Sequence, residues 1–239
     1  MKLFCFPYAG GSAAVYNNWK SLLNKNIDLI PVELAGRGKR IHESFYNDFS
    51  EVIEDVYSQI SNEIEKESNY AFFGHSMGAK IAYELTQKII KDGLPIPKHI
   101  FFSGRGAPYI SGKDEKQYYK LPDNEFKKEI MKLGGTPKEF FEHPELLEVF
   151  LPLLKNDFKL SERSKKTDNI RALPFDITVF LGKDDELTPE QIDSWKKYTF
   201  KTCNIHFYNG GHFFINNKYK DVIKIINNKL QLENVPIFY

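Results

Sequence analysis

Ser76 has the surroundings that most clearly favour chemistry in this 239-residue chain. It is the middle residue of Gly74-His75-Ser76-Met77-Gly78, which follows the apolar run 70–73 and precedes a helical pattern. This is the strand–turn–helix context of the G-x-S-x-G nucleophile elbow, in which glycines leave room for the adjoining strand and helix. The turn strains the serine backbone and puts it at a helix N-terminus, where negative charge is favoured. We therefore predict that Ser76 is a nucleophile, rather than part of a glycine-rich turn without chemistry.

A serine hydroxyl needs a neighbouring base, and in this arrangement the order along the chain is serine, acid, histidine. His212 follows the apolar run 204–208 in Asn209-Gly210-Gly211-His212-Phe213-Phe214, a loop at the end of a strand where a base would reach the elbow. His206 alternates within that run and is expected to be a packed or edge histidine. The sequence therefore favours His212 over His206 and over two earlier histidines, His99 and His143.

The acid is expected at the end of the preceding strand. The run 177–181 leads into Gly182-Lys183-Asp184-Asp185-Glu186, which supplies three adjacent carboxylates. The Gly-x-x-Asp spacing favours Asp185, with Asp184 as the second choice. Asp157 is a weaker alternative from an earlier position, and Asp184 and Glu186 also suit the N-terminus of a helix at Pro189.

A tetrahedral intermediate needs two N–H donors aimed at its oxygen, each worth roughly 3–4 kcal/mol. One is expected from the backbone of Met77, the residue after the nucleophile. The second is expected from Ala9, in the small-residue turn Phe6-Pro7-Tyr8-Ala9-Gly10-Gly11-Ser12 after the first strand. A phosphate-binding loop is the alternative for this turn, but the turn lacks the Walker lysine and the G-x-G-x-x-G spacing.

Strands and helices that alternate along the chain would position these residues. Nearly all-apolar runs predict strands at residues 3–6, 29–33, 70–73, 99–103, 177–181 and 204–208, and helical patterns lie between them at residues 12–23, 49–65, 77–91, 189–198 and 218–230. This alternation predicts an α/β class chain with a mostly parallel sheet and helices on both of its faces.

One long segment interrupts the alternation. Residues 113–166 contain no clear strand, only short helical pieces separated by proline and glycine. We expect residues 1–239 to form a single domain in which this insertion is a helical lid, because long insertions are usually functional or form a subdomain. Helices that merely pack on the sheet are the alternative.

The bulk composition excludes several partners. There are 33 basic and 32 acidic residues, a balance that gives no electrostatic reason to expect nucleic acid or an anionic membrane. No apolar run reaches the roughly 20 residues of a membrane span, and the apolar N-terminal run is too short for a signal peptide. We expect a cytoplasmic protein in which Cys5 and Cys203 are free thiols.

Six motifs occur in the order found in one family: Phe6-Pro7-Tyr8-Ala9-Gly10-Gly11, Leu34-Ala35-Gly36-Arg37-Gly38-Lys39-Arg40, Gly74-His75-Ser76-Met77-Gly78-Ala79, Ser103-Gly104-Arg105 with Ala107-Pro108, Leu151-Pro152-Leu153-Leu154-Lys155-Asn156-Asp157-Phe158 and Gly210-Gly211-His212-Phe213-Phe214. Together they resemble the type II (external) thioesterases of nonribosomal peptide and polyketide synthesis, a group of the α/β-hydrolase superfamily that includes medium-chain fatty-acid-synthase thioesterases. The resemblance covers nearly the whole chain. The family commonly has proline at the position of Ala35 and arginine at that of Lys155.

The resemblance implies an α/β-hydrolase fold and hydrolysis of acyl or aminoacyl thioesters on the phosphopantetheine arm of carrier proteins, which frees blocked synthase modules. Acyl or peptidyl carrier protein domains would be the partners. No cofactor or metal is implied, because phosphopantetheine arrives with the carrier, and nothing in the sequence demands more than a monomer. Basic residues within 113–132 are candidates for carrier contact. The alternatives are a medium-chain acyl-carrier-protein thioesterase, a general carboxylesterase and an inactive carrier-binding module.

Overall fold

A six-stranded parallel sheet forms the centre of the computed structural model, which describes residues 1–66, 68–110, 117–136, 139–163 and 170–232. The strands are β1 (Lys2–Phe6), β2 (Asp28–Pro31), β3 (Tyr70–His75), β4 (His99–Ser103), β5 (Ile177–Gly182) and β6 (Cys203–Tyr208). Their order is β2-β1-β3-β4-β5-β6, and every neighbouring pair is parallel. The predicted parallel sheet is confirmed, and its carboxyl ends meet at one edge.

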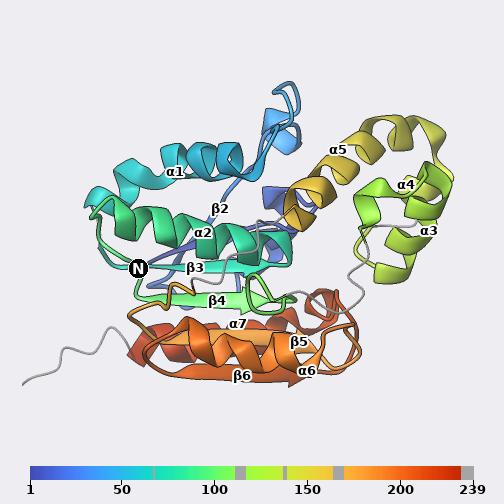
Figure 1. Ribbon diagram of the computed structural model, residues 1–239. Helices are drawn as coiled ribbons and strands as arrows, with labels where there is room; N and C mark the ends of the chain where they lie inside the picture. Colours follow the sequence, from blue (N-terminus) through green and yellow to red (C-terminus); the bar gives the residue numbers. More distant parts are fainter. Residues whose placement is uncertain (67, 111–116, 137–138, 164–169, 233–239) are drawn as a thin grey trace, which may run out of the picture.

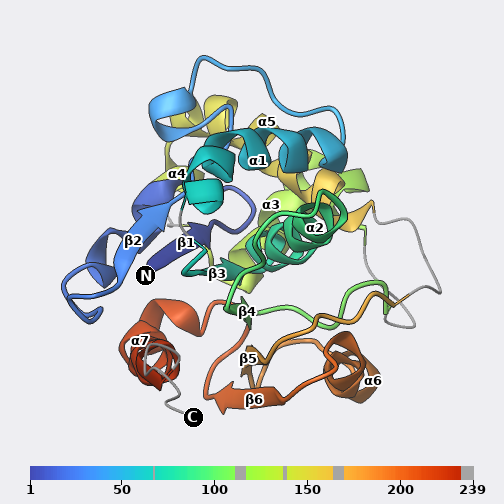
Figure 2. The ribbon, with the colours of Figure 1, turned by 90° about the vertical axis from the view of Figure 1, so that its left-hand side faces the viewer.

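Helices cover both faces of this sheet, as the apolar strands predict. One face packs against α1 (Phe49–Lys66), α2 (Met77–Lys91), α6 (Pro189–Asp193) and the 3₁₀ helix η4 (Ser194–Tyr198), and the other against the 3₁₀ helix η1 (Ala13–Trp19) and α7 (Ile215–Leu232) (Figure 2). Side chains on successive strand residues point to opposite faces. Phe4 and Phe72 accordingly join the first cluster, whereas Cys5 and Phe73 join the second.

The described part of the insertion between β4 and β5 is helical. It consists of η3 (Tyr118–Lys120), α3 (Asp123–Leu133), α4 (Glu139–Glu142) and α5 (Pro144–Glu162). Figure 1 shows α3 and α4 beyond the arrowheads of the strands, with α5 running from them toward the sheet. A small cluster of buried side chains joins α3 to α5, namely Phe126, Ile130 and Leu154. The insertion therefore lies at the sheet edge where the elbow serine is also found.

Some element boundaries differ from the sequence prediction. The segment 12–23 contains a 3₁₀ helix, η1, in which Tyr16 and Trp19 are buried three residues apart, a spacing that suits three residues per turn. The predicted helix 189–198 changes to 3₁₀ geometry at Ser194, and α7 begins three residues earlier than expected, at Ile215. Strand β2 ends at Pro31, which has no N–H to donate to a ladder.

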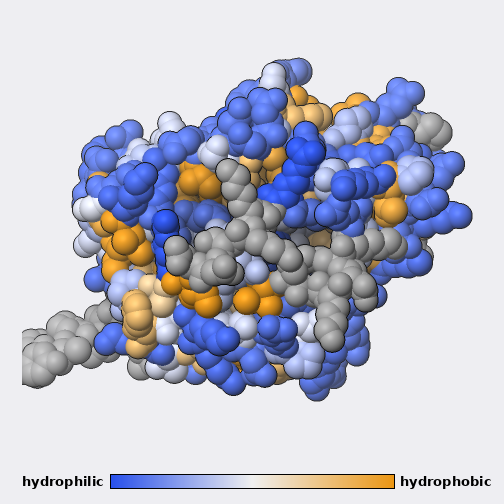
Figure 3. Space-filling model, in the orientation of Figure 1, coloured by the Kyte–Doolittle hydropathy of each residue, from blue (hydrophilic) through white to orange (hydrophobic). Residues whose placement is uncertain are grey.

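The outer surface shown in Figure 3 is mostly hydrophilic, with small hydrophobic patches near its middle. Within the described ranges, no helix combines the length and apolar character that crossing a membrane requires.

Candidate active site

Ser76 lies in a strained turn between β3 and α2. Its backbone has φ 54° and ψ −111°, a region that non-glycine residues rarely adopt, and its N–H donates to the Ser103 carbonyl at 2.8 Å. The flanking glycines have no room for a side chain, because a Cβ on Gly74 would lie 2.0 Å from the Gly78 carbonyl oxygen. This close approach of strand and helix is the geometry expected of a nucleophile elbow.

His212 and Asp185 meet Ser76 from the loops after β6 and β5. The His212 Nε2 lies 2.9 Å from the Ser76 Oγ. On the other side of the ring, Nδ1 lies 3.1 Å from Asp185 Oδ2 and 3.3 Å from Oδ1. The side chains of His212 and Asp185 are 19% and 8% exposed, so this chain of contacts is largely shielded from water. The structure therefore brings together the three side chains that the sequence selects.

The alternative residues lie elsewhere. The exposed Asp184 carboxylate accepts the Gly210 N–H at 3.2 Å, and that of Asp157 is bound by Arg37. The ring of His206, a residue of β6, packs on Phe180 of β5, and the His99 Nε2 contacts the Thr178 Oγ1. His143 is exposed beside Glu145. Among the described residues, Asp185 is the carboxylate that lies within hydrogen-bonding distance of His212.

Met77 and Ala9 are the two residues predicted to offer backbone N–H groups to the oxyanion. Met77 is the first residue of α2, so its N–H has no partner inside the helix. Across the described residues, neither the Met77 N–H nor the Ala9 N–H donates a hydrogen bond. The turn after β1, residues 7–11, packs on the start of α2, since a Cβ on Gly78 would lie 2.9 Å from the Pro7 carbonyl oxygen and 2.1 Å from that of Phe6 at the end of β1. We call residues 7–11 the β1 loop. Both donors predicted for the oxyanion thus belong to adjoining segments.

His75 is a neighbour of the site that the sequence analysis did not single out. Its ring is fully buried 5.3 Å from that of His212, and its Nδ1 lies 2.9 Å from the Ser103 Oγ. Burial, and then the nearby His212, hold the pKa of His75 well below its ordinary value, so the ring is neutral at physiological pH. A neutral, packed ring supports His212 without competing for its carboxylate partner. The motif position alone gave no signal for this role.

The insertion packs directly on the site. A Cβ on Gly10 of the β1 loop would lie 2.6 Å from the Leu154 side chain of α5 and 3.0 Å from that of Phe150. After α3, Gly135 lies so close to the ring of Phe213, next to His212, that a Cβ there would come within 2.0 Å. Helix α5 therefore covers the β1 loop, and the segment after α3 covers residues 209–214, which we call the histidine loop.

Arg37 and Asp157 form a buried ion pair beside the β1 loop, which the sequence analysis did not predict. Both residues lie within motifs of the family resemblance, but their pairing joins segments 120 residues apart.

As for metals, the described residues contain no group of three or more histidine, cysteine, aspartate or glutamate side chains able to hold an ion.

A parallel sheet with helices on both faces and a strand–serine–helix elbow at its carboxyl edge defines an α/β-hydrolase. The chain belongs to the thioesterase domain family, whose model matches residues 1–230. This membership agrees with the resemblance found in the sequence motifs.

Three known proteins place the chain within this family. It is 35% identical to the linear gramicidin dehydrogenase LgrE of Brevibacillus parabrevis, over 96% of this chain and 87% of that protein. It is 33% identical to the medium-chain S-acyl fatty acid synthase thioesterase of Rattus norvegicus, over 90% of this chain and 81% of that protein. The crystal structure of ClbQ from the colibactin NRPS/PKS pathway superposes with a TM-score of 0.89 at 35% identity, over 98% of this chain and 99% of that one.

The name of LgrE denotes a different chemistry from the family model. In this chain the turn after β1 lacks the G-x-G-x-x-G spacing of a dinucleotide-binding turn, and β3 leads into a nucleophile elbow instead. These features of the chain agree with the thioesterase family model.

Proposed function

We propose that this protein is a type II thioesterase that hydrolyses acyl or aminoacyl thioesters on the phosphopantetheine arm of carrier proteins, and thereby regenerates blocked synthase modules. The observation that carries the proposal is the contact of 2.9 Å between Ser76 Oγ and His212 Nε2, with Asp185 behind the ring. ClbQ, which belongs to an NRPS/PKS pathway, supports the choice of substrate class through its similarity in both sequence and structure.

In the proposed reaction, Ser76 Oγ attacks the thioester carbonyl carbon while His212 Nε2 takes the hydroxyl proton. Asp185 holds the ring so that Nδ1 keeps its own proton and the imidazolium is stabilised. The Ala9 and Met77 N–H groups would receive the developing oxyanion. The C–S bond then breaks, and His212 returns the proton to the departing pantetheine thiol.

The second half of the reaction repeats these roles with water. His212 takes a proton from a water molecule, whose oxygen attacks the acyl-serine carbonyl carbon. The C–O bond to Ser76 breaks, the serine oxygen regains the proton from His212, and the free acid leaves. Neither half needs a cofactor in the protein itself, since the phosphopantetheine belongs to the carrier.

The helices α3, α4 and α5 would act as the lid of this site. Leu154 of α5 contacts the β1 loop, and Gly135, in the segment after α3, lies against Phe213 of the histidine loop, so the acyl group would bind between the lid and the serine. The basic residues predicted for carrier contact include Lys120, Lys128 and Lys132, which are described, whereas residues 113–116 lie outside the described part of the chain. We expect the carrier to approach this edge of a monomer.

The test is a panel of carrier proteins loaded with short acyl, aminoacyl and medium-chain groups, followed by intact-mass measurement of acyl loss. The wild-type protein is expected to unload short or aminoacyl carriers, and Ser76→Ala is expected to lose at least about 10⁴-fold in rate. Acyl release that is the same with wild type, with Ser76→Ala and with the loaded carrier alone would instead point to a carrier-binding module without catalysis.

The second candidate is a medium-chain acyl-carrier-protein thioesterase, which the similarity to the rat enzyme favours. Exclusive hydrolysis of the medium-chain carriers in the same panel would support it. Faster cleavage of small oxygen esters than of any carrier-bound thioester would contradict both candidates in favour of a carboxylesterase.

A further inference from the structure

Asp157, on the lid helix α5, reaches into the centre of the protein and binds the β1 loop. Its side chain is fully buried, and its Oδ2 accepts the backbone N–H of Gly10 at 2.7 Å. Gly10 immediately follows Ala9, whose N–H is the proposed oxyanion donor. The carboxylate therefore holds the peptide next to the one that must face the substrate.

Arg37 holds this carboxylate from the opposite side. Its NH1 and NH2 groups donate to the two oxygens of Asp157 at 2.5 and 2.8 Å, in a bidentate pair whose arginine side chain is 4% exposed. The same NH1 lies 3.3 Å from the Gly11 carbonyl oxygen. Asp157 and Arg37 together thus bind an N–H and a C=O of the β1 loop.

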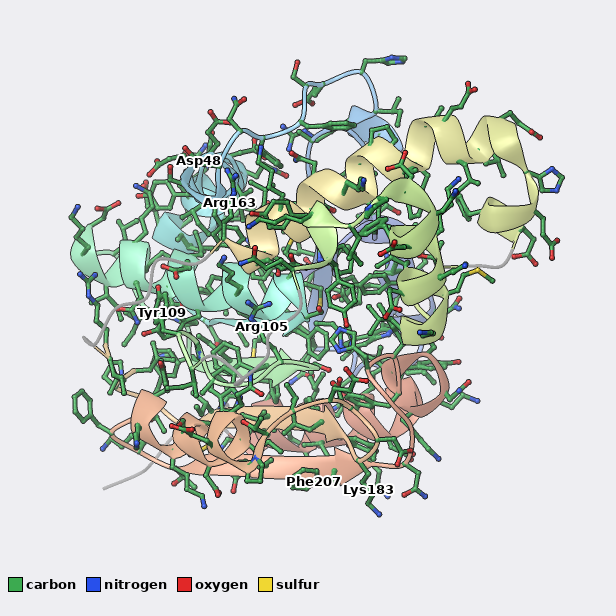
Figure 4. All side chains as sticks on the ribbon, turned by 45° about the vertical axis from the view of Figure 1, so that its right-hand side comes forward. Asp48, Arg105, Tyr109, Arg163, Lys183 and Phe207 are labelled. Atoms are coloured by element: carbon green, nitrogen blue, oxygen red, sulfur yellow. The ribbon has the colours of Figure 1, made fainter. Side chains whose placement is uncertain are left out.

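The part of α5 that carries Asp157 is itself anchored. At its last turn, Lys80 Nζ donates to the carbonyls of Leu160 and Ser161, both at 3.0 Å. Arg105, labelled in Figure 4 beside α2, donates to the Ser161 Oγ at 3.0 Å. Asp157 consequently projects from a helix end that is fixed to the core.

Stability alone is a weak reason for such a pair. Burying two charges costs several kcal/mol each, and replacing a buried pair with apolar side chains is often neutral or stabilising. Apolar side chains would suit this position, since Leu154 and Phe150 already contact Gly10. A carboxylate can do what those side chains cannot, which is to fix the direction of a backbone N–H.

We propose that Asp157, oriented by Arg37, is a positioning residue that sets the β1 loop so that the Ala9 N–H faces the oxyanion. The inference rests on the proposed function, because it assigns Ala9 to the acyl-transfer reaction. It also means that the lid and the oxyanion donors are physically joined, so that α5 cannot leave the β1 loop without disturbing catalysis.

The test compares Asp157→Asn with Asp55→Asn. Asp55 is the control, because it also accepts a bidentate pair from an arginine, Arg40, at 2.7 and 2.9 Å, but its side chain is 24% exposed and, within the described contacts, does not touch the β1 loop. Asp157→Asn is expected to lower kcat by about 10- to 300-fold with KM within about threefold, since losing a whole oxyanion donor costs about 10²–10³. Asp55→Asn is expected to change kcat by less than about threefold, although its Tm falls.

A second readout does not depend on the carrier substrate. An alkyl fluorophosphonate forms a P–O bond with Ser76 and expels fluoride, and its phosphoryl oxygen occupies the oxyanion position. Asp157→Asn should slow this labelling at least tenfold relative to Asp55→Asn, when both are measured well below Tm. If the wild type labels but releases no acyl group from any carrier, the proposed function fails while this comparison still decides the inference.

Equal effects of the two variants on kcat and labelling would overturn the inference, as would an unchanged kcat in folded Asp157→Asn. Should Asp157→Asn not fold, Arg37→Lys decides, because it keeps the positive charge but loses the bidentate geometry and the Gly11 contact. A fall in its kcat at constant KM supports the inference, and an unchanged kcat refutes it.

Discussion

Asp185→Asn distinguishes the two adjacent carboxylates at the end of β5. In the proposed mechanism His212 becomes an imidazolium whose Nδ1 lies 3.1 Å from Asp185 Oδ2. At an effective dielectric constant of about 20, two unit charges at that separation attract by about 5 kcal/mol. An asparagine amide that donates to Nδ1 would in addition leave the proton on Nε2, where the ring can no longer accept one from Ser76.

The expected result is a fall in kcat of about 10³- to 10⁴-fold with little change in KM, since each 1.36 kcal/mol corresponds to about tenfold in rate. The matched variant is Asp184→Asn, whose carboxylate binds the Gly210 N–H, and kcat should stay within about threefold. Release of the carrier thiol measures both variants, with circular dichroism as the check on folding. A rate for Asp185→Asn within tenfold of wild type, or an equal loss in Asp184→Asn, would refute this assignment of the acid.

Two further predictions concern stability and packing. Burial, and then the charge of Arg105, lower the pKa of Lys80 from 10.5 to about 7, so above pH 7 the unfolded chain binds a proton that the folded protein has lost. The free energy of unfolding, relative to that of Lys80→Met, should therefore rise by about 1.4 kcal/mol per pH unit between pH 7.5 and 9 in urea titrations, and a flat difference would contradict this. Gly78→Ala puts a Cβ 2.1 Å from the Phe6 carbonyl oxygen at the end of β1. The variant should therefore be destabilised by about 1–3 kcal/mol and have a lower kcat. An unchanged Tm and kcat would contradict this expectation.

Much of the fold follows from local pattern. Apolar runs separated by helical patterns predicted all six strands and the parallel sheet, because strands buried on both faces cannot alternate with polar residues. The 3₁₀ geometry of η1 was not predictable, because helical periodicity over a few residues does not distinguish burial every third residue from an α-helical stripe. The role of residues 113–166 as a lid stays a prediction, as do the monomeric state and the cytoplasmic location.

The candidate site also has features that the sequence predicts and features that only the structure shows. The sequence by itself singled out Ser76 and His212 as partners, which the structure places 2.9 Å apart, because a glycine-flanked turn after a strand and a histidine after the last strand are local features with a fixed place at the edge of a parallel sheet. The Gly-x-x-Asp spacing favoured Asp185 over Asp184, but only the tertiary structure shows which of these chemically identical neighbours contacts His212, because the folded loop sets the direction of each side chain. It alone revealed the bond of Asp157 to Gly10, because residues 147 positions apart acquire a common environment only when the chain is packed.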